Sequence, residues 1–488
     1  MAKNENLNMG SKSTVNRGNT TVIDGENIEQ FGYKQELRRG MTLKDIVLYG
    51  VLFMVIIAPQ SIFGEIQQAS SGMTPLVYIV GFIAISFTAM GYMRMSNRFP
   101  IAGSVYSYVQ RGINHHVGFV AGWLILLDYV FVPALLYIMV ANWGMELIPN
   151  SPWWAWLVWI GAFVIFNTFV NIRGVQLTKG IDWIIFVIEI LAVVAFICIG
   201  MSFVIGGGND GTLAVTIDPL FKPEEVNFQF IATACSIACL SFLGFDGIST
   251  LAEETVRPEK TIGRGIMIAL FAIVVVFVLQ TYVAALIQPD WKNTDAAVGF
   301  FDSAEIAGGT LLRNILLVVN IVAIGIANIM NAQTASARLL FSMGRDGVLP
   351  RVFGKVHSKF KTPWVASIFL GAISIILTYS LHFAVQGEEM TILVKLVNFG
   401  ALSSFILLNF AVFWFFFIKD GKRTTAGDFI KYLVCPAFGI LILGYVFSGF
   451  DMTTWLVGLV WLVIGLIVGA VKSNFYKEVP EAFKRLEV

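Results

Sequence analysis

The sequence predicts an all-α integral membrane protein with twelve transmembrane helices. Composition is the first observation: the 488 residues are 57% hydrophobic and 13% charged, with a mean hydropathy of +0.75. A soluble chain of this length would divide into domains with charged surfaces. The net charge of +1 gives no acidic or basic excess that would indicate a nucleic-acid partner. We therefore expect one polytopic domain that has the lipid bilayer as its surroundings.

Apolar segments are the second observation, since a helix needs about 20 apolar residues to cross the hydrocarbon core. Twelve segments meet this length, and the eighth is long enough to continue as a cytoplasmic helix. The segments lie near residues 43–69, 75–96, 117–142, 153–172, 180–205, 229–251, 262–288, 310–341, 362–381, 390–418, 429–448 and 453–472.

The distribution of basic residues is the third observation. With the N-terminus placed inside, only Lys222, Lys292 and Arg313 fall at the outer side, and Lys395 falls within the tenth segment. The other 29 of the 33 lysines and arginines then fall at the inner side. Cytoplasmic loops carry such an excess of basic residues. The sequence thus predicts twelve spans in the cell membrane with both termini in the cytoplasm.

Domain limits follow from the same pattern. The first forty residues are rich in Asn, Lys and Glu and lack the apolar core of a signal peptide. We expect residues 1–40 to be a disordered cytoplasmic tail. Residues 41–474 form the twelve-helix domain, and residues 475–488 form a second cytoplasmic tail.

Two spans contain residues that interrupt a helix. In the first span, Pro59 removes a helix hydrogen bond, Gly64 relaxes the backbone and Glu65 places a carboxylate at depth. The sixth span contains the stretch "SFLGFDGIST", in which Asp246 lies between two glycines. Interrupted helices at corresponding places in two halves of a chain are typical of inverted-repeat transporters. The repeats would cover about 43–205 and 229–418.

Physical cost supports a binding site at these interruptions. Unsatisfied backbone groups in hydrocarbon cost several kcal/mol each, and an acid at the bilayer centre costs at least about 2.5 kcal/mol. A span with both features is expected to line a polar site. For Asp246 alone an alternative stays open, in which its carboxylate caps the second half-helix.

Further acids lie near mid-depth. Asp128, followed by Tyr129, lies in the third span, and Glu189 lies in the fifth, without Lys or Arg at helical spacing in either span. Such a carboxylate is protonated, faces water or binds a cation, and a protonated structural hydrogen bond is the alternative. Glu253 and Glu254 are expected near the cytoplasmic end as an inner gate or a loop anchor. Lys395 is expected to extend toward the outer surface, with a gate salt bridge as the alternative.

Several stretches resemble the amino acid–polyamine–organocation permeases, and among them the bacterial putrescine importers. These stretches are "SFLGFDGISTLAEET" (241–255), "ARLLFSMGRDGVLP" (337–350), "HSKFKTP" (357–363), "FPIAGSVYSYVQRGINHHVGFVAGWLILLDYVFVP" (99–133) and "LVNFGALSSF" (396–405). The resemblance covers nearly the whole chain after residue 40. It implies a LeuT-type fold with ten helices in two inverted repeats, broken helices 1 and 6, and two peripheral helices over 429–472. It also implies uptake driven by the proton gradient, with substrate held between the broken helices.

Two departures from this pattern bear on the substrate. In the first span the importers have a motif that resembles "FDTFG", where this chain has "QSIFG". The aspartate of that motif corresponds to Ser61 here, and Glu65, one turn on, would take its place unless the substrate differs. Many amino acid permeases of the superfamily have a lysine near the position that aligns with Glu189. Amino acid permeases also have a motif that resembles G-S/T-G in the first span, whose amides hold the substrate carboxylate. This chain has only Gly64 there, with Glu65 beside it. Because carboxylates repel one another, the acidic set favours a diamine over an amino acid.

The resulting hypothesis is a proton-coupled importer of a small organic cation, putrescine first, that works by alternating access. Asp128, Asp246 and Glu65 would hold ammonium groups, Glu189 would respond to protons, and no cofactor or obligate protein partner is expected. The complete predicted substrate site consists of Pro59, Ser61, Phe63, Gly64, Glu65, Asp128, Tyr129, Phe242, Gly244, Phe245, Asp246 and Gly247. In it the aromatic rings would add cation–π contacts and the glycines would expose backbone.

Three other functions remain possible from the sequence. An amino acid permease, or an amino acid/amine exchanger, on the same fold predicts competition by an amino acid. A membrane-embedded enzyme would need a nucleophile–base pair or metal ligands at depth, but the histidines lie near or outside span ends and no HExxH or GxSxG motif occurs. A channel would show no accumulation against a gradient.

Overall fold

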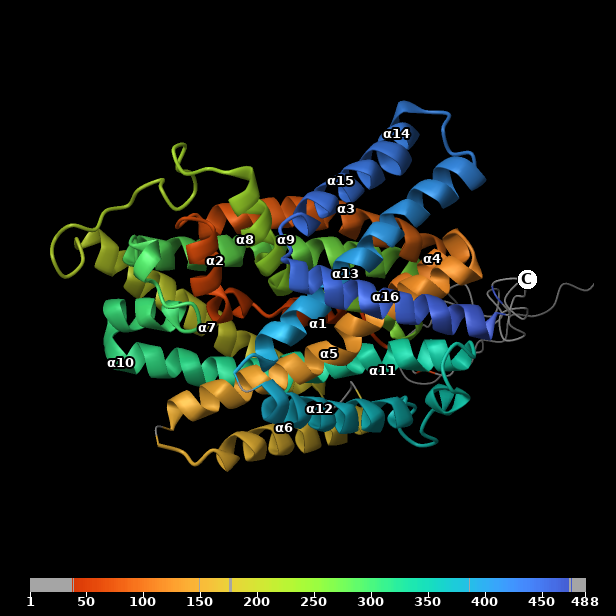
Figure 1. Ribbon diagram of the computed structural model, residues 1–488, viewed down its shortest axis with the longest axis horizontal. Helices are drawn as coiled ribbons and strands as arrows, with labels where there is room; N and C mark the ends of the chain where they lie inside the picture. Colours follow the sequence, from red (N-terminus) through yellow and green to blue (C-terminus); the bar gives the residue numbers. More distant parts are fainter. Residues whose placement is uncertain are drawn as a thin grey trace, which may run out of the picture.

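The fold is an all-helical bundle in which most helices run along the long axis of the molecule (Figure 1). The computed structural model describes residues 37, 39–148, 150–174, 178–385, 387–473 and 475. The predicted tails at 1–40 and 475–488 lie outside these residues, apart from Leu37, Arg39, Gly40 and Phe475. The prediction about the disorder of the first tail therefore stays a prediction.

Helices account for the regular structure of the described ranges, apart from an isolated parallel bridge between Met41 and Thr255. The long helices alternate with short 3₁₀ and π-helical segments, which carry the letter η. In chain order the elements are α1 (Leu43–Met54), η2 (Ala58–Ser61), α2 (Phe63–Ala69), α3 (Thr74–Arg98), α4 (Ser104–Gly112), α5 (His115–Leu147), α6 (Trp154–Arg173), α7 (Thr178–Ile205), α8 (Phe228–Phe242), η3 (Asp246–Glu254), α9 (Pro258–Ile287), η4 (Trp291–Asn293), α10 (Gly299–Val322), η5 (Ala323–Asn328), α11 (Ile329–Arg345), η6 (Arg351–Gly354), α12 (Trp364–Val385), α13 (Glu389–Val412), η7 (Phe413–Lys419), α14 (Ala426–Phe429), η8 (Ile430–Val434), α15 (Cys435–Phe447) and α16 (Met452–Lys472).

Twelve helical segments of the described chain are long and apolar enough to cross a membrane, so the predicted number of spans is confirmed. The eighth differs from its prediction: it covers Gly299–Arg345, and its extra length precedes the predicted start at 310. Gly309 has φ 72° and ψ 179° and divides α10. Glycine tolerates this left-handed backbone because it has no Cβ. The first ten residues of α10 therefore form a separate helical piece, and the predicted cytoplasmic continuation stops at Arg345.

The centre of the bundle is held by close pairs of helices, notably α3 with α9 and α5 with α13. Glycines permit these approaches, because small residues let membrane helices come together. A Cβ at Gly263 of α9 would lie 2.4 Å from Met93 of α3, and one at Gly400 of α13 would lie 2.5 Å from the Leu124 carbonyl oxygen of α5. The α5–α13 pair thus forms a tightly fitted wall beside the interrupted spans.

The last helix, α16, joins this wall through two tryptophans. The Trp123 and Trp461 indole nitrogens each donate a hydrogen bond to the other's backbone carbonyl, both at 2.9 Å. Their rings stack with centroids 4.7 Å apart. The reciprocal bonds satisfy both indoles in an apolar setting and fix α16 against α5. Helices α14 and α15 rise away from the bundle at its upper edge (Figure 1).

Candidate functional site

The first span is interrupted directly after α1. Val55 has φ 57° and ψ 115°, a backbone conformation that β-branched residues rarely adopt. The chain then forms η2, with Pro59 in its first turn, and continues as α2. Gly64 in α2 packs against backbone, since a Cβ there would lie 1.9 Å from the Asp295 carbonyl oxygen. Gly64 is therefore required for the contact of α2 with the loop before α10.

The sixth span is interrupted between α8 and η3. Leu243 is extended and Gly244 has φ 108°, which requires glycine. A Cβ on Gly244 would lie 2.9 Å from the Phe53 ring, and one on Gly247 would lie 2.1 Å from it. The two glycines therefore form a notch that holds the ring of Phe53, the second-last residue of α1. The two interruptions meet at this side chain.

Amide side chains satisfy the backbone carbonyls that the first interruption leaves without helical partners. Asn328 of η5 donates through Nδ2 to the Phe53 carbonyl at 2.6 Å and to the Leu52 carbonyl at 3.4 Å. Gln280 of α9 donates through Nε2 to the Ile56 carbonyl at 2.7 Å. Unsatisfied carbonyls would cost several kcal/mol in a membrane interior. These amides thus stabilise the open backbone at the centre of the protein.

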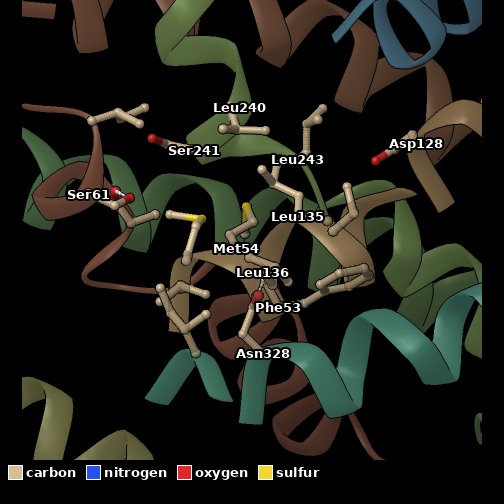
Figure 2. A pocket seen from close by; sticks show the side chains of 17 residues that line it. Phe53, Met54, Ser61, Asp128, Leu135, Leu136, Leu240, Ser241, Leu243 and Asn328 are labelled. Atoms are coloured by element: carbon tan, nitrogen blue, oxygen red, sulfur yellow. Dashed lines mark hydrogen bonds between the residues drawn. The ribbon is translucent and has the colours of Figure 1, made fainter. Parts of the chain in front are cut away.

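A cavity of about 60 Å³ lies where the two interruptions meet (Figure 2). Its walls come from α1, η2, α5, α8 and η5 and are mostly apolar. The residues that line it are Phe53, Met54, Val55, Ala58, Ser61, Ile62, Asp128, Val132, Leu135, Leu136, Met139, Leu240, Ser241, Leu243, Gly244, Ile324 and Asn328. Apolar walls with a few polar groups are typical of small-molecule sites.

Asp128 is the one charged residue among those that line the cavity. It is 5% exposed and lies on α5, which presents it opposite Ser61 in the view of Figure 2. Within the described residues its carboxylate has neither a hydrogen-bond nor an ion-pair partner. A buried carboxylate without a partner is costly unless a cation or a proton joins it. Asp128 can therefore bind an ammonium group.

Asp246 lies behind the cavity wall and has partners of its own. Its Oδ2 accepts hydrogen bonds from the Tyr129 hydroxyl at 2.6 Å and from the Ser104 hydroxyl at 3.3 Å. It is 1% exposed and does not line the cavity. The cluster brings together Asp246 and Tyr129, two of the predicted residues, and adds Ser104 of α4. Asp246 thus lies near the site without presenting its own oxygens to the cavity.

Other predicted residues lie elsewhere. Of the predicted substrate site, Ser61, Asp128 and Gly244 line the cavity, and the Ser61 hydroxyl donates to the Ala58 carbonyl at 2.7 Å. Glu65 is exposed on α2, so the structure does not bring it to Asp128. Pro59, Gly64 and Gly247 are buried beside the interruptions without lining the cavity, and three predicted rings pack away from it: Phe63 on Phe300, Phe242 on Tyr78, and Phe245 on Tyr92.

Glu189 lies on α7, away from the cavity lining, and is 1% exposed. Neither of its carboxylate oxygens has a hydrogen-bond partner among the described residues. Asp182 precedes it by two helical turns and is also buried, so both acids lie on the same face of α7. Helix α7 packs against α1 and η5, the elements that border the first interruption. Glu189 thus lies on a helix that packs against the interrupted first span.

Sequence reasoning missed fourteen of the seventeen lining residues, and two of these, Phe53 and Asn328, carry chemistry that bears on the site. Phe53 supplies an aromatic ring to the lining, and Asn328 supplies an amide at the cavity wall. The asparagine had a visible signal, since "NIMNAQT" brings several polar side chains into the apolar eighth span. Phe53 had none, because one phenylalanine among many apolar residues does not reveal the face on which it lies.

Glu253 and Glu254 at the end of η3 form what we term the Glu253 network, with Arg338 and Arg345 of α11. The Arg345 guanidinium binds Glu253 through two bonds of 3.1 and 3.0 Å, and Arg338 pairs with Glu254. Glu253 also accepts a hydrogen bond from the Ala102 amide at 3.2 Å. The amides of Gly40 and Met41 donate to the Glu254 carbonyl at 2.9 and 3.0 Å. The network thus ties four chain segments together at one end of the bundle.

Comparison with known proteins agrees with this architecture. The sequence pattern of the amino acid permease family matches residues 46–481. The low-affinity putrescine importer PlaP of Escherichia coli K12 is 33% identical over 91% of this chain and 96% of its own length. The branched-chain amino acid permease BcaP and the methylthioribose transporter of Bacillus subtilis are 25% and 26% identical, each over 89% of this chain and 93% of their own lengths. The chain is a multi-pass membrane transporter, not an enzyme, and belongs to the amino acid permease family of the amino acid–polyamine–organocation superfamily.

Proposed function

We propose that this transporter imports a small organic cation across the cell membrane by alternating access, with the proton gradient as its driving force. Putrescine is the first candidate substrate. The observation that carries the proposal is the carboxylate of Asp128, which lines an apolar cavity at the junction of the two interrupted spans and has no partner within the described residues. The putrescine importer among the relatives supports the same substrate class.

The cavity chemistry explains how a cation would be recognised. An ammonium group beside Asp128 replaces the missing partner in a medium of low dielectric, where the attraction is strong. The nearby charge of Asp246, held by Tyr129 and Ser104, adds to the negative potential. The Phe53 ring and the aliphatic walls suit a methylene chain, and the ring can add a cation–π contact.

Alternating access requires that the two ends of the bundle open in turn. The Glu253 network ties segments together at one end of the bundle, and the distribution of lysine and arginine predicts that this end is cytoplasmic. Release of substrate would then require the ion pairs of the network to separate. Protonation of a group that is solvated differently in the outward-open and inward-open states shifts the balance between them, and we give this role to Glu189.

Uptake into proteoliposomes tests the proposal directly. Radiolabelled putrescine should accumulate under an inward proton gradient, and an ionophore should abolish the accumulation. Asp128→Asn should lower affinity by at least about thirtyfold, because a desolvated ammonium loses its charged partner. Asp210→Asn, on an exposed loop, is the matched control and should leave uptake unchanged. Competition by amino acids but not by amines would favour the amino acid permease or exchanger instead.

Glu189→Gln tests proton coupling. Glutamine has nearly the same shape but cannot ionise, so accumulation should collapse and the dependence of uptake on external pH should flatten, while binding of substrate persists. The measurement is initial uptake at a series of external pH values, with Asp210→Asn again as control. Unchanged accumulation and an unchanged pH profile would remove Glu189 from the mechanism.

A further inference from the structure

Six buried asparagines of the described residues carry a side-chain polar atom without a hydrogen-bond partner, and Asn328 is the one of them that lines the cavity. Its Oδ1 is the atom without a partner, and the residue is 3% exposed. Its Nδ2 already donates to the carbonyls of Phe53 and Leu52. A carbonyl oxygen accepts only from a donor, so these two bonds fix which end of the amide is nitrogen. The free atom is therefore a hydrogen-bond acceptor.

The position of this acceptor is set by the fold. Asn328 is the last residue of η5, and the Asn328 side chain rises from its helix toward Phe53 and Leu136 (Figure 2). Asp128 reaches the same cavity from α5, at another edge of the view. Asp128 and Asn328 thus both line the cavity, and each has an acceptor without a donor among the described residues, one acidic and one neutral. A ligand that leaves a buried acceptor without a donor binds more weakly than one that supplies the donor.

We propose that Asn328 is the second recognition residue of the substrate site and accepts a hydrogen bond from the end of the substrate opposite to the ammonium at Asp128. This inference rests on the proposed function, because it assigns the second half of the same site. The substrate class follows: a short, unbranched amine with a hydrogen-bond donor at its far end. Because the amide is neutral, the far donor can be an ammonium or a hydroxyl, whereas a methyl group leaves Oδ1 unsatisfied.

A series of four-carbon amines separates these cases. Putrescine has an ammonium at each end, 4-amino-1-butanol has one ammonium and one hydroxyl, and butylamine has one ammonium and one methyl. In competition for transport by the wild-type protein, 4-amino-1-butanol should come within a few-fold of putrescine. Butylamine should be weaker than 4-amino-1-butanol by about tenfold, since it leaves a buried acceptor unpaired.

Variants of Asn328 test whether the amide is responsible. Asn328→Ala should bring the ratio between butylamine and 4-amino-1-butanol close to one. Asn328→Asp keeps an acceptor, adds a charge and should increase the preference for putrescine over 4-amino-1-butanol. The ratios matter more than the rates, because loss of the bonds to Phe53 and Leu52 would slow transport of every amine equally. If the alanine variant does not fold, the ratio between putrescine and 4-amino-1-butanol in Asn328→Asp tests the inference instead.

Asn398 offers a matched control. It is buried, its Nδ2 donates to the Ser236 carbonyl at 3.1 Å, and its Oδ1 also has no partner within the described chain, but it does not line the cavity. Asn398→Ala should leave the ratios between the three amines unchanged. Equal competition by all three amines in the wild type, or unchanged ratios in Asn328→Ala, would overturn the inference while leaving the cation transporter intact. Failure of all three to compete would instead overturn the proposed function.

Discussion

The sixth span carries buried acids in two contrasting environments. At its centre Asp246, together with Asp128 of α5, lies among hydroxyls and apolar side chains, and Asp128 has no cationic partner within the described residues. At its end Glu253 and Glu254 are each paired with an arginine. The Glu253 side chain is fully buried and that of Arg345 is 15% exposed. Carboxylates thus differ in their pairing: the paired acids hold segments together, and the unpaired Asp128 is the acid that we propose for the ligand.

Removal of a paired acid should have the largest effect on stability. Glu253→Ala leaves the largely buried Arg345 guanidinium without its bidentate partner, which should destabilise the protein by about 3 kcal/mol. Thermal unfolding in detergent micelles measures the loss. Asp128→Asn is the contrasting variant, and it should show no such loss because it removes an acid that has no partner. The double variant Glu253→Arg/Arg345→Glu should recover part of the stability. Equal melting temperatures for Glu253→Ala and the wild type would contradict a stabilising role for the paired acid.

Tyr129→Phe should have an intermediate effect. It removes the 2.6 Å hydrogen bond to Asp246, and hydrogen bonds to charged groups contribute about 1.5–3 kcal/mol. The expected result is a lower melting temperature and a loss of putrescine affinity much smaller than in Asp128→Asn. Tyr379→Phe removes a hydroxyl that is bonded to the neutral Leu157 carbonyl at 2.7 Å, and serves as the control. A loss of affinity as large as that of Asp128→Asn would mean that Asp246, not Asp128, is the main cation partner.

Lys395→Ala should have the smallest effect. Lys395 forms an ion pair, in which its Nζ lies 2.7 Å from Oδ2 of Asp451, with the lysine side chain 31% and the aspartate side chain 48% exposed; its predicted extension toward the outer surface stays a prediction. Exposed pairs of this kind contribute about 0–1 kcal/mol. Burial raises the pKa of Asp451, but hydrogen bonds from Lys395 and Thr454 outweigh it and hold the pKa below its usual value. A depressed carboxyl pKa stabilises the fold only while the group is ionised.

The stabilisation that the Lys395–Asp451 pair provides should depend on pH in one direction. The difference in melting temperature between Lys395→Ala and the wild type should be present at neutral pH and should vanish as the pH falls through the pKa of Asp451. A large difference that persists in acid would show that Lys395 acts by packing rather than by charge.

Hydropathy predicted the fold better than it predicted the site. Twelve spans follow from apolar length alone, and the search for acids inside apolar spans selected Asp128, which lines the cavity. Counting does not give the face of a helix, because these spans are apolar all round and lack an amphipathic stripe. For this reason Phe63, Phe242 and Phe245 were expected in the site but pack behind it. The interruptions add a second uncertainty, since an irregular backbone rotates the residues after it, as at Glu65.

The Phe53 ring in its notch has a mechanical consequence. A ring seated against Gly244 and Gly247 resists sliding of the first span past the sixth, because either glycine would need to leave the ring before its span could shift. We therefore expect the two interrupted spans to pivot about the ring rather than to slide past one another. A tilt of either span would then turn about Phe53, which lines the cavity itself.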